Sequence, residues 1–181
     1  MKVGARALGI DDAPFERGRS TRTKIVGVLM RGVIVEGVDV EPVEVDGLDA
    51  TDAVLTLHER LGSQARVIFT HGTVVAGFNP LDLSRISSEA GIPVIAILDK
   101  PPSWPEVEKA MISHGLEQNL VILKQNPPYE PLDTPSGSVV CARSGISRQD
   151  AVRLLLRWQI ESKHPEPLRV AHLISKILTQ D

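Results

Sequence analysis

The sequence predicts a single α/β domain in which helices flank a mixed β-sheet. Its first half contains strand-like apolar runs in direct succession, and later runs alternate with helical patterns. This order is typical of a sheet that combines antiparallel and parallel strands. The length of 181 residues matches one compact domain, so we expect a single core over residues 1–181.

The first half of the chain supplies most of the predicted sheet. We expect a strand at residues 6–10, a basic loop at 16–24, two or three consecutive strands at 25–45, and a helix at 51–61. Gly32 and Gly37 are the expected turn or bulge positions within the consecutive strands.

The second half alternates strands with helices. We expect strands at 66–71, 92–98, 119–124 and 136–142, and helices at 81–90, around 107–111, at 148–161 and at 168–179. A proline-rich loop is expected at 126–135. Ser147 and Asp150 have the spacing of a capping box, and Pro167 suits a first helical turn.

Composition excludes several classes of protein. No apolar run approaches the roughly 20 residues that span a bilayer, and the N-terminus lacks the apolar core of a signal peptide. The single cysteine, Cys141, stands in an apolar run and is expected to be a buried, inert thiol in a cytoplasmic protein. With a net charge of −3 and 3% aromatic residues, nucleic-acid binding would require a local basic patch.

Two predicted strands end on aspartate or histidine, side chains that commonly bind metal ions in proteins. Asp11 closes the first strand, next to Asp12 and Pro14, and His71 closes the strand at 66–71. If these strands are neighbours, about 4.8 Å apart, both side chains reach one crevice at the carboxyl ends of the strands. The alternatives are a turn built on Asp11 and Asp12, and a hydrogen-bonded structural histidine at position 71.

The last predicted helix separates polar from apolar positions. At 100° per residue, Arg169, His172 and Lys176 share one face. Val170, Leu173, Ile174 and Ile177 form an apolar stripe that is expected to face the core. We therefore expect His172 and Arg169 either at the rim of the crevice, with Arg169 contacting a phosphate, or on a solvated polar face.

The loop after the first strand carries the densest basic cluster of the chain: Arg17, Arg19, Arg22 and Lys24. Such a cluster is either simply solvated or follows a nucleic-acid backbone by charge alone. Its position beside the Asp11 end of the predicted sheet favours the second interpretation if the crevice binds DNA or RNA.

Five segments in order, "GIDDAPF", "VDGLDATDAV", "HGTVVAGFN", "GIPVIAILDKPP" and "HPEPLRVAHLI", give the chain its resemblance to a known family. The sequence resembles an uncharacterised archaeal family related to endonuclease V, over nearly its whole length. The resemblance implies a ribonuclease H-like mixed sheet. It also implies a nuclease that hydrolyses a phosphodiester near inosine in DNA or RNA with Mg²⁺ or Mn²⁺.

The resemblance assigns roles to particular residues. Asp11 matches the first metal-binding aspartate, His71-Gly72 matches an Asp-Gly pair, and His172 matches a position near the metal. Asp49 is the nearest match to a further catalytic carboxylate. Asp49 also has the spacing of a helix N-cap, with Asp52 three residues later.

The sequence departs from the endonuclease V pattern at two places that bear on activity. His71 replaces an aspartate, which weakens a magnesium site and favours manganese, zinc or another softer ion. The segment "VEPVEVDGLD" has no aromatic residue to act as a wedge between bases. The alternative function is therefore a non-catalytic nucleic-acid-binding protein that retains the nuclease fold.

Overall fold

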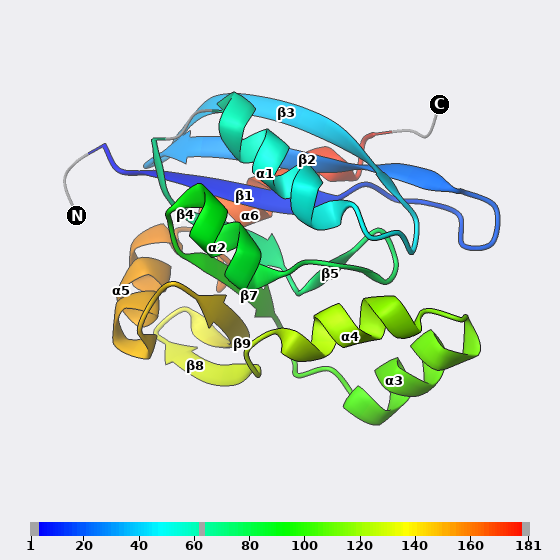
Figure 1. Ribbon diagram of the computed structural model, residues 1–181. Coiled ribbons are helices and arrows are strands. Elements are labelled where there is room, and N and C mark those ends of the chain that lie inside the picture. Colours follow the sequence, from blue (N-terminus) through cyan, green and yellow to red (C-terminus); the bar gives the residue numbers. More distant parts are fainter. Residues whose placement is uncertain (1–3, 62–63, 179–181) are drawn as a thin grey trace.

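A computed structural model describes residues 4–61 and 64–178, and a seven-stranded sheet crosses its centre (Figure 1). The strand order is β3-β2-β1-β4-β7-β9-β8. The strands are β1 (Arg6–Asp12), β2 (Arg22–Arg31), β3 (Ile34–Glu44), β4 (Ala65–His71), β7 (Val94–Leu98), β8 (Glu130–Thr134) and β9 (Gly137–Ser144). Two short strands, β5 (Val74–Val75) and β6 (Asn79–Pro80), pair separately.

The sheet is mixed, as predicted. β1, β2 and β3 form an antiparallel meander, β1, β4 and β7 run parallel at the centre, and β9 is antiparallel to β7. The carboxyl ends of the three parallel strands therefore meet at one edge of the sheet. The turn at Gly32 and the irregularity near Gly37 lie within the β2–β3 pair, where the sequence places them.

Six helices accompany the sheet in the described part of the chain: α1 (Ala50–Leu61), α2 (Leu83–Ala90), α3 (Trp104–Ser113), α4 (Glu117–Gln125), α5 (Arg148–Trp158) and α6 (Glu166–Ser175). Apolar residues of α1 and α2 form the core on one face of the sheet, and those of α5 and α6 form the core on the other. Figure 1 shows α1 in front of the sheet and α6 behind it. α6 packs on β1 and β2.

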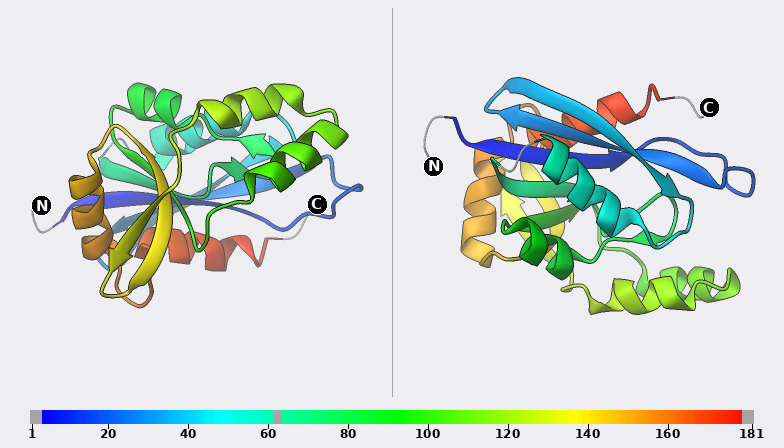
Figure 2. Two further views of the ribbon diagram at one scale, coloured as in Figure 1. Left: turned by 90° about the horizontal axis from the view of Figure 1, so that it is seen from below. Right: turned by 45° about the horizontal axis from the view of Figure 1, so that its top comes forward.

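The strand predicted at 119–124 is wrong, because this segment belongs to α4. Leu120 and Leu123 lie three residues apart and pack with Met111 of α3 in a third, separate core. Four apolar residues in a row resemble a buried strand in sequence, but here the helical spacing decides which of them are buried. Figure 2 shows α3 and α4 side by side, away from α5 and α6.

Smaller differences concern element ends. Arg22 and Lys24 lie in β2 rather than in a loop, and the predicted loop at 126–135 contains β8, which pairs with β9. α6 begins at Glu166, with Pro167 in its first turn, and ends at Ser175. The predicted end at Thr179 lies outside the described residues. Within the described part, no helix is long and apolar enough to cross a membrane.

Two local predictions are confirmed. The Ser147 hydroxyl oxygen accepts a hydrogen bond from the Asp150 backbone N–H, which caps α5. Cys141 is buried in β9, and this burial raises the pKa of its thiol.

Candidate metal centre

Asp11 is a buried carboxylate at the end of a central strand. β1 lies between β2 and β4, and its residues Ala7, Leu8 and Ile10 are fully buried. The same burial extends to Asp11, whose exposed fraction is 1%. A buried carboxylate requires partners, because the loss of water is costly for a charged group. One partner is local: the Asp12 backbone N–H donates to Asp11 Oδ1 over 3.0 Å.

His71 reaches Asp11 from the neighbouring parallel strand. In the β1–β4 register Ile10 lies opposite Thr70, so the next residues of the two strands are adjacent. The Nδ1 atom of His71 lies 3.5 Å from Asp11 Oδ1. Asp11 and His71 therefore share one edge of the sheet, as the sequence predicts.

His172 reaches the same carboxylate from α6, 161 residues further along the chain. Its Nδ1 lies 2.6 Å from Asp11 Oδ2. This contact depends on Gly9, because a Cβ atom at position 9 would overlap the backbone of Pro167 at the start of α6. The absence of a side chain at Gly9 lets the helix lie directly on the strand.

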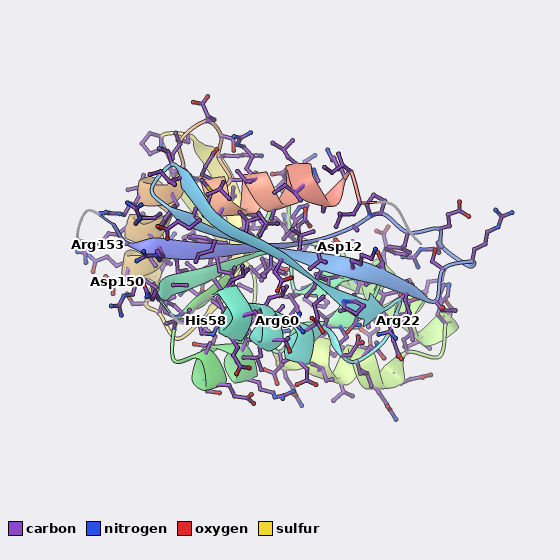
Figure 3. All side chains as sticks on the ribbon, turned by 90° about the horizontal axis from the view of Figure 1, so that it is seen from above. Asp12, Arg22, His58, Arg60, Asp150 and Arg153 are labelled. Atoms are coloured by element: carbon purple, nitrogen blue, oxygen red, sulfur yellow. The ribbon has the colours of Figure 1, made fainter. Side chains whose placement is uncertain are left out.

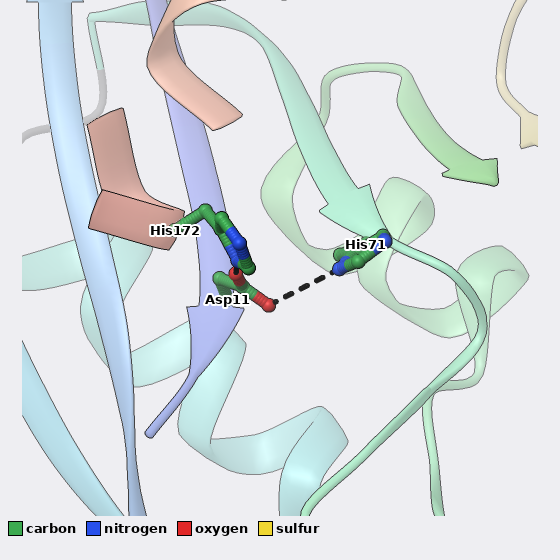
Figure 4. Close-up of side chains that lie close together, drawn as sticks. All are labelled: Asp11, His71 and His172. Carbon is green, nitrogen blue, oxygen red and sulfur yellow. Dashed lines mark hydrogen bonds and ion pairs between the residues drawn. The ribbon is translucent and has the colours of Figure 1, made fainter. Parts of the chain in front are cut away.

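The three side chains point toward one another from two strands and a helix (Figure 4). One ligand atom from each of Asp11, His71 and His172 can be chosen so that all three lie within 4.8 Å of one another. The rings of His71 and His172 meet edge to face, with centroids 5.9 Å apart. A carboxylate and two imidazoles at this spacing form a candidate site for a divalent cation.

The charges of the centre reinforce one another. Burial alone would raise the pKa of Asp11, but its contacts with His71 and His172 outweigh burial and hold that pKa below its ordinary value. The Asp11 carboxylate in turn raises the pKa of the His71 imidazole, against the effect of burial. The contact between Asp11 and His71 therefore favours the ionised carboxylate and the protonated imidazole together.

The centre opens into a cavity of about 280 Å³, whose lining includes two residues that sequence analysis did not select. These are Asp99, directly after β7, and His164, before α6. His164 Nε2 lies 2.7 Å from Asp99 Oδ1, and the ring centroids of His164 and His71 are 6.1 Å apart. Asp99 could have been found by the rule that identified Asp11 and His71, because it also follows a buried parallel strand.

The structure gives Asp12 a separate function. Asp12 Oδ2 accepts a hydrogen bond from the Ala76 backbone N–H over 2.7 Å, and its burial raises the pKa of the carboxyl group. Asp12 therefore fixes the segment that follows His71.

Asp49 is placed at the start of α1, where its backbone carbonyl accepts the first helical hydrogen bond, from Ala53. Its carboxylate accepts hydrogen bonds from Glu44 N–H and from the Asn79 side chain, at 3.2 and 2.6 Å. It does not line the cavity that contains Asp11. Asp49 thus occupies the N-cap position that its sequence spacing allows.

α6 presents Arg169 and His172 to the cavity, but Lys176 does not line it. The guanidinium of Arg169 forms an ion pair with Glu166, one turn earlier. The predicted apolar stripe of this helix is partly wrong, since Leu173 and Ile177 are exposed, whereas Leu168, Ala171 and Ser175 are buried. The backbone of Pro167 and Leu168 in this helix lies against Gly9 of β1.

The basic cluster is split between a loop and β2. Arg17, Arg19 and Arg22 are exposed, and Lys24 is half-buried. Arg17 lies over the ring of Phe78, 5.3 Å from its centroid, and Arg19 pairs with Glu16. None of the four lines the cavity of the metal centre. Figure 3 shows Arg22 at the end of the molecule opposite Arg153 of α5.

Comparison with known proteins places this chain beside archaeal relatives and nucleases. A family model described as endonuclease dU matches residues 3–179. A UPF0215 protein of Thermoplasma volcanium is 34% identical over 179 residues, which cover 98% of this chain and 91% of the relative.

Solved structures of other proteins share the fold of this chain. A protein of unknown function from Archaeoglobus fulgidus has a TM-score of 0.84 at 29% identity, over 94% of this chain and 96% of that one. Endonuclease V of Ciona intestinalis, bound to inosine-containing DNA, has a TM-score of 0.63 at 12% identity, over 95% and 84%. The predicted ribonuclease H-like fold and its structural similarity to endonuclease V are thereby confirmed.

Replacing Gly9 by alanine should disrupt the centre from a distance. The new methyl group must push α6 away from β1, which moves His172 from Asp11 and costs at least about 1–3 kcal/mol of unfolding free energy. Urea denaturation and calorimetric Mn²⁺ titration measure the two effects. Gly37→Ala is the matched control, because its methyl group meets side chains rather than backbone, and the nearest atom is the far end of the flexible Leu61 side chain. Equal behaviour of the two variants would contradict this account of Gly9.

The metal-free protein should lose stability as the pH rises. His71 has a higher pKa in the folded chain than its ordinary value of 6.5, because of Asp11. Below pH 6.5 protonated His71 therefore makes its full contribution to the free energy of unfolding. This contribution is lost as the pH rises through the pKa of His71 in the folded chain. Urea denaturation in chelator at several pH values measures this loss, which His71→Gln should remove. The same pH dependence in the variant would assign the effect to another group.

Proposed function

Because the chain belongs to the endonuclease dU family, we propose that it is a divalent-metal-dependent endonuclease. It hydrolyses a phosphodiester next to a deaminated base, in inosine- or deoxyuridine-containing nucleic acid. The observation that carries this proposal is the convergence of Asp11, His71 and His172 on one point of a cavity. A catalytic role for Asp49 finds no support in its position at the start of α1.

The donor set decides which ion suits the centre. One carboxylate and two imidazoles provide few of the oxygen ligands that Mg²⁺ prefers, whereas Mn²⁺ and Zn²⁺ accept nitrogen and oxygen together. Asp11, His71 and His172 would hold the ion, and we expect Mn²⁺ to support activity better than Mg²⁺. When bound, such an ion stabilises charge on phosphate oxygens and makes a water molecule more acidic.

The residues of the chain contribute binding and orientation. Asp11 carries the negative charge that draws a cation into the cavity, and its low pKa keeps it ionised at neutral pH. Arg169 faces the same cavity while Glu166 holds its guanidinium. This arrangement supports a role for Arg169 in holding a substrate phosphate.

The comparisons support the proposal at the level of family and fold. The family description names an endonuclease dU, and the Ciona intestinalis endonuclease V was solved with DNA containing an inosine. These names give two substrates to test, one with a one-ring base and one with a two-ring base.

A second candidate function is nucleic-acid binding without cleavage. The observation that favours it is that the centre contains one carboxylate, and both of its oxygens lie close to histidine nitrogens. In that case the exposed arginines before β2 would hold the nucleic-acid backbone, and no metal would be needed.

Removing the Asp11 charge should abolish cleavage. Asp11→Asn is expected to slow Mn²⁺-dependent cleavage of an inosine- or deoxyuridine-containing oligonucleotide at least about a hundredfold, because bound metal supplies several kcal/mol of transition-state stabilisation. Chelator should have the same effect on the wild type. A gel assay with Mg²⁺, Mn²⁺ and Zn²⁺ measures it.

Asp49→Ala is the control for this experiment. It should lower the unfolding free energy by about 1 kcal/mol, because Glu44 N–H and the Asn79 side chain lose their hydrogen-bond acceptor, and leave cleavage unchanged. Cleavage by Asp11→Asn at the wild-type rate would refute the proposal. Salt-sensitive binding with no cleavage in any metal would support the second candidate.

The basic loop should contribute to affinity through charge alone. Replacing Arg17 and Arg19 by alanine is expected to weaken oligonucleotide binding for every sequence, and to lower the slope of log affinity against log salt by about 0.7–0.9 for each lost phosphate contact. Fluorescence anisotropy across a salt series measures both. Arg153→Ala, at the opposite end of the molecule, is the control. An unchanged slope would exclude the loop from the binding surface.

A further inference from the structure

The cavity of the metal centre holds a second carboxylate–histidine pair, Asp99 with His164, beside the candidate metal ligands. Asp99 lies directly after β7, and His164 lies between α5 and α6; both line the cavity. His164 Nε2 lies 2.7 Å from Asp99 Oδ1. The His164 ring meets the ring of His71 edge to face, with centroids 6.1 Å apart. His164 therefore stands next to a candidate metal ligand, inside the same cavity.

The Asp99–His164 pair is unsuited to a metal ion of its own. The Lys163 ammonium lies 3.0 Å from the same Asp99 oxygen that His164 contacts, and it would repel a cation there. Among the residues that the structure describes, the one group of three ligands close enough to hold an ion is that of the metal centre. The pair therefore differs from the metal centre in the chemistry that it can supply.

The charge of Asp99 decides which nitrogen of His164 carries a hydrogen. Hydrogen bonds from His164 and Lys163 hold the pKa of the Asp99 carboxyl below its ordinary value, so this group is an ionised acceptor at neutral pH. His164 Nε2 therefore donates, and in the neutral ring Nδ1 is an acceptor. No hydrogen bond from the described residues occupies His164 Nδ1. A ring that lines the cavity thus offers an acceptor nitrogen.

The backbone around His164 is held in place by its own segment. The Ser162 hydroxyl accepts a hydrogen bond from the His164 backbone N–H over 3.1 Å and donates one to the His164 carbonyl oxygen over 3.2 Å. The Gln159 side chain donates to the Lys163 carbonyl oxygen over 2.5 Å. Pro165 follows at the N-cap of α6, the helix that carries His172. The backbone of the segment is therefore fixed, and Asp99 fixes the direction of the His164 ring.

Fold stability does not account for the Asp99–His164 contact. The Asp99 side chain is 58% exposed, and ion pairs of exposed groups contribute little to folding. What the contact achieves is the orientation of one ring inside a cavity, and groups held in the productive geometry before the reaction begins are a main source of catalysis.

We propose that His164 accepts a hydrogen bond from the water that attacks the phosphodiester, and that Asp99 is the positioning residue that aims His164 Nδ1 at this water. The inference rests on the proposed function and assigns two further residues to it. In the reaction the water oxygen bonds to phosphorus while an ester P–O bond breaks. The water releases one proton to solvent, and the departing oxygen takes one from solvent. His164 holds the water with a lone pair toward phosphorus, the orientation that attack requires.

Removing the His164 ring should slow the chemical step and leave substrate binding intact. His164→Ala is expected to lower kcat for Mn²⁺-dependent oligonucleotide cleavage about a hundredfold at an unchanged KM, because misplacing a reactant by about 1 Å can cost that much. Added imidazole should restore part of the lost rate, which a histidine with a structural role would not show. His114→Ala, at the exposed C-cap of α3, is the matched control and should keep the wild-type kcat.

The tautomer of His164 gives a readout that needs neither metal nor substrate. Nitrogen-15 NMR of the metal-free protein, at a pH where the ring is neutral, should show the Nε2–H tautomer in the wild type. Asp99→Asn should show a mixture of tautomers, because an amide can accept or donate, and should lower kcat without changing KM. Lys163→Ala is the matched control, since it removes the other partner of Asp99 and keeps the carboxylate. Far-ultraviolet circular dichroism shows that each variant is folded.

Failure of the inference and failure of the nuclease proposal give different results. If the wild type cleaves and His164→Ala cleaves with the same kcat, the nuclease proposal stands and the role of His164 is wrong. An Nδ1–H tautomer in the wild type would overturn the inference whether or not the protein cleaves. If the wild type cleaves no oligonucleotide in Mg²⁺, Mn²⁺ or Zn²⁺, the nuclease proposal fails and the inference fails with it.

Discussion

The buried carboxylate of Asp11 is the constraint on which the candidate centre depends. An ionised group with 1% exposure is stable only where neighbouring groups replace its lost water. His71 and His172 provide that replacement from β4 and from α6, and neither is close to Asp11 in the chain. The fold must therefore bring β1 beside β4 and press α6 against β1. Gly9 makes the second contact possible, because the backbone of α6 occupies the place of its side chain.

The topology of the sheet explains why chemical groups gather at this edge. β1, β4 and β7 are parallel neighbours, so their carboxyl ends lie at the same edge of the sheet. Asp11, His71 and Asp99 stand at these three ends. Residues before and within α6 complete the set with His164 and His172. His71 thus lies between two carboxylate–histidine pairs, Asp11 with His172 and Asp99 with His164. The pKa of the His71 imidazole is raised chiefly by Asp11. The candidate centre thus lies at the carboxyl ends of the parallel strands, where open α/β sheets bind their ligands.

The α3–α4 pair extends this edge into a second surface. It has its own apolar core and shares few residues with the two cores that flank the sheet. Its position makes His71 a common wall of two cavities, one polar and one aromatic.

The sequence by itself determined the strands that end at Asp11 and His71 and the capped start of α5, since strand burial and local capping are properties of short segments. Only the tertiary structure decided that 119–124 is helical, that the Asp49 carboxylate bonds Glu44 and Asn79 away from the cavity, that Leu173 and Ile177 face outward, and that Asp99 and His164 join the cavity. These outcomes depend on which surfaces meet. A periodic pattern shows that one face is apolar, but the partner that covers that face comes from a distant part of the chain.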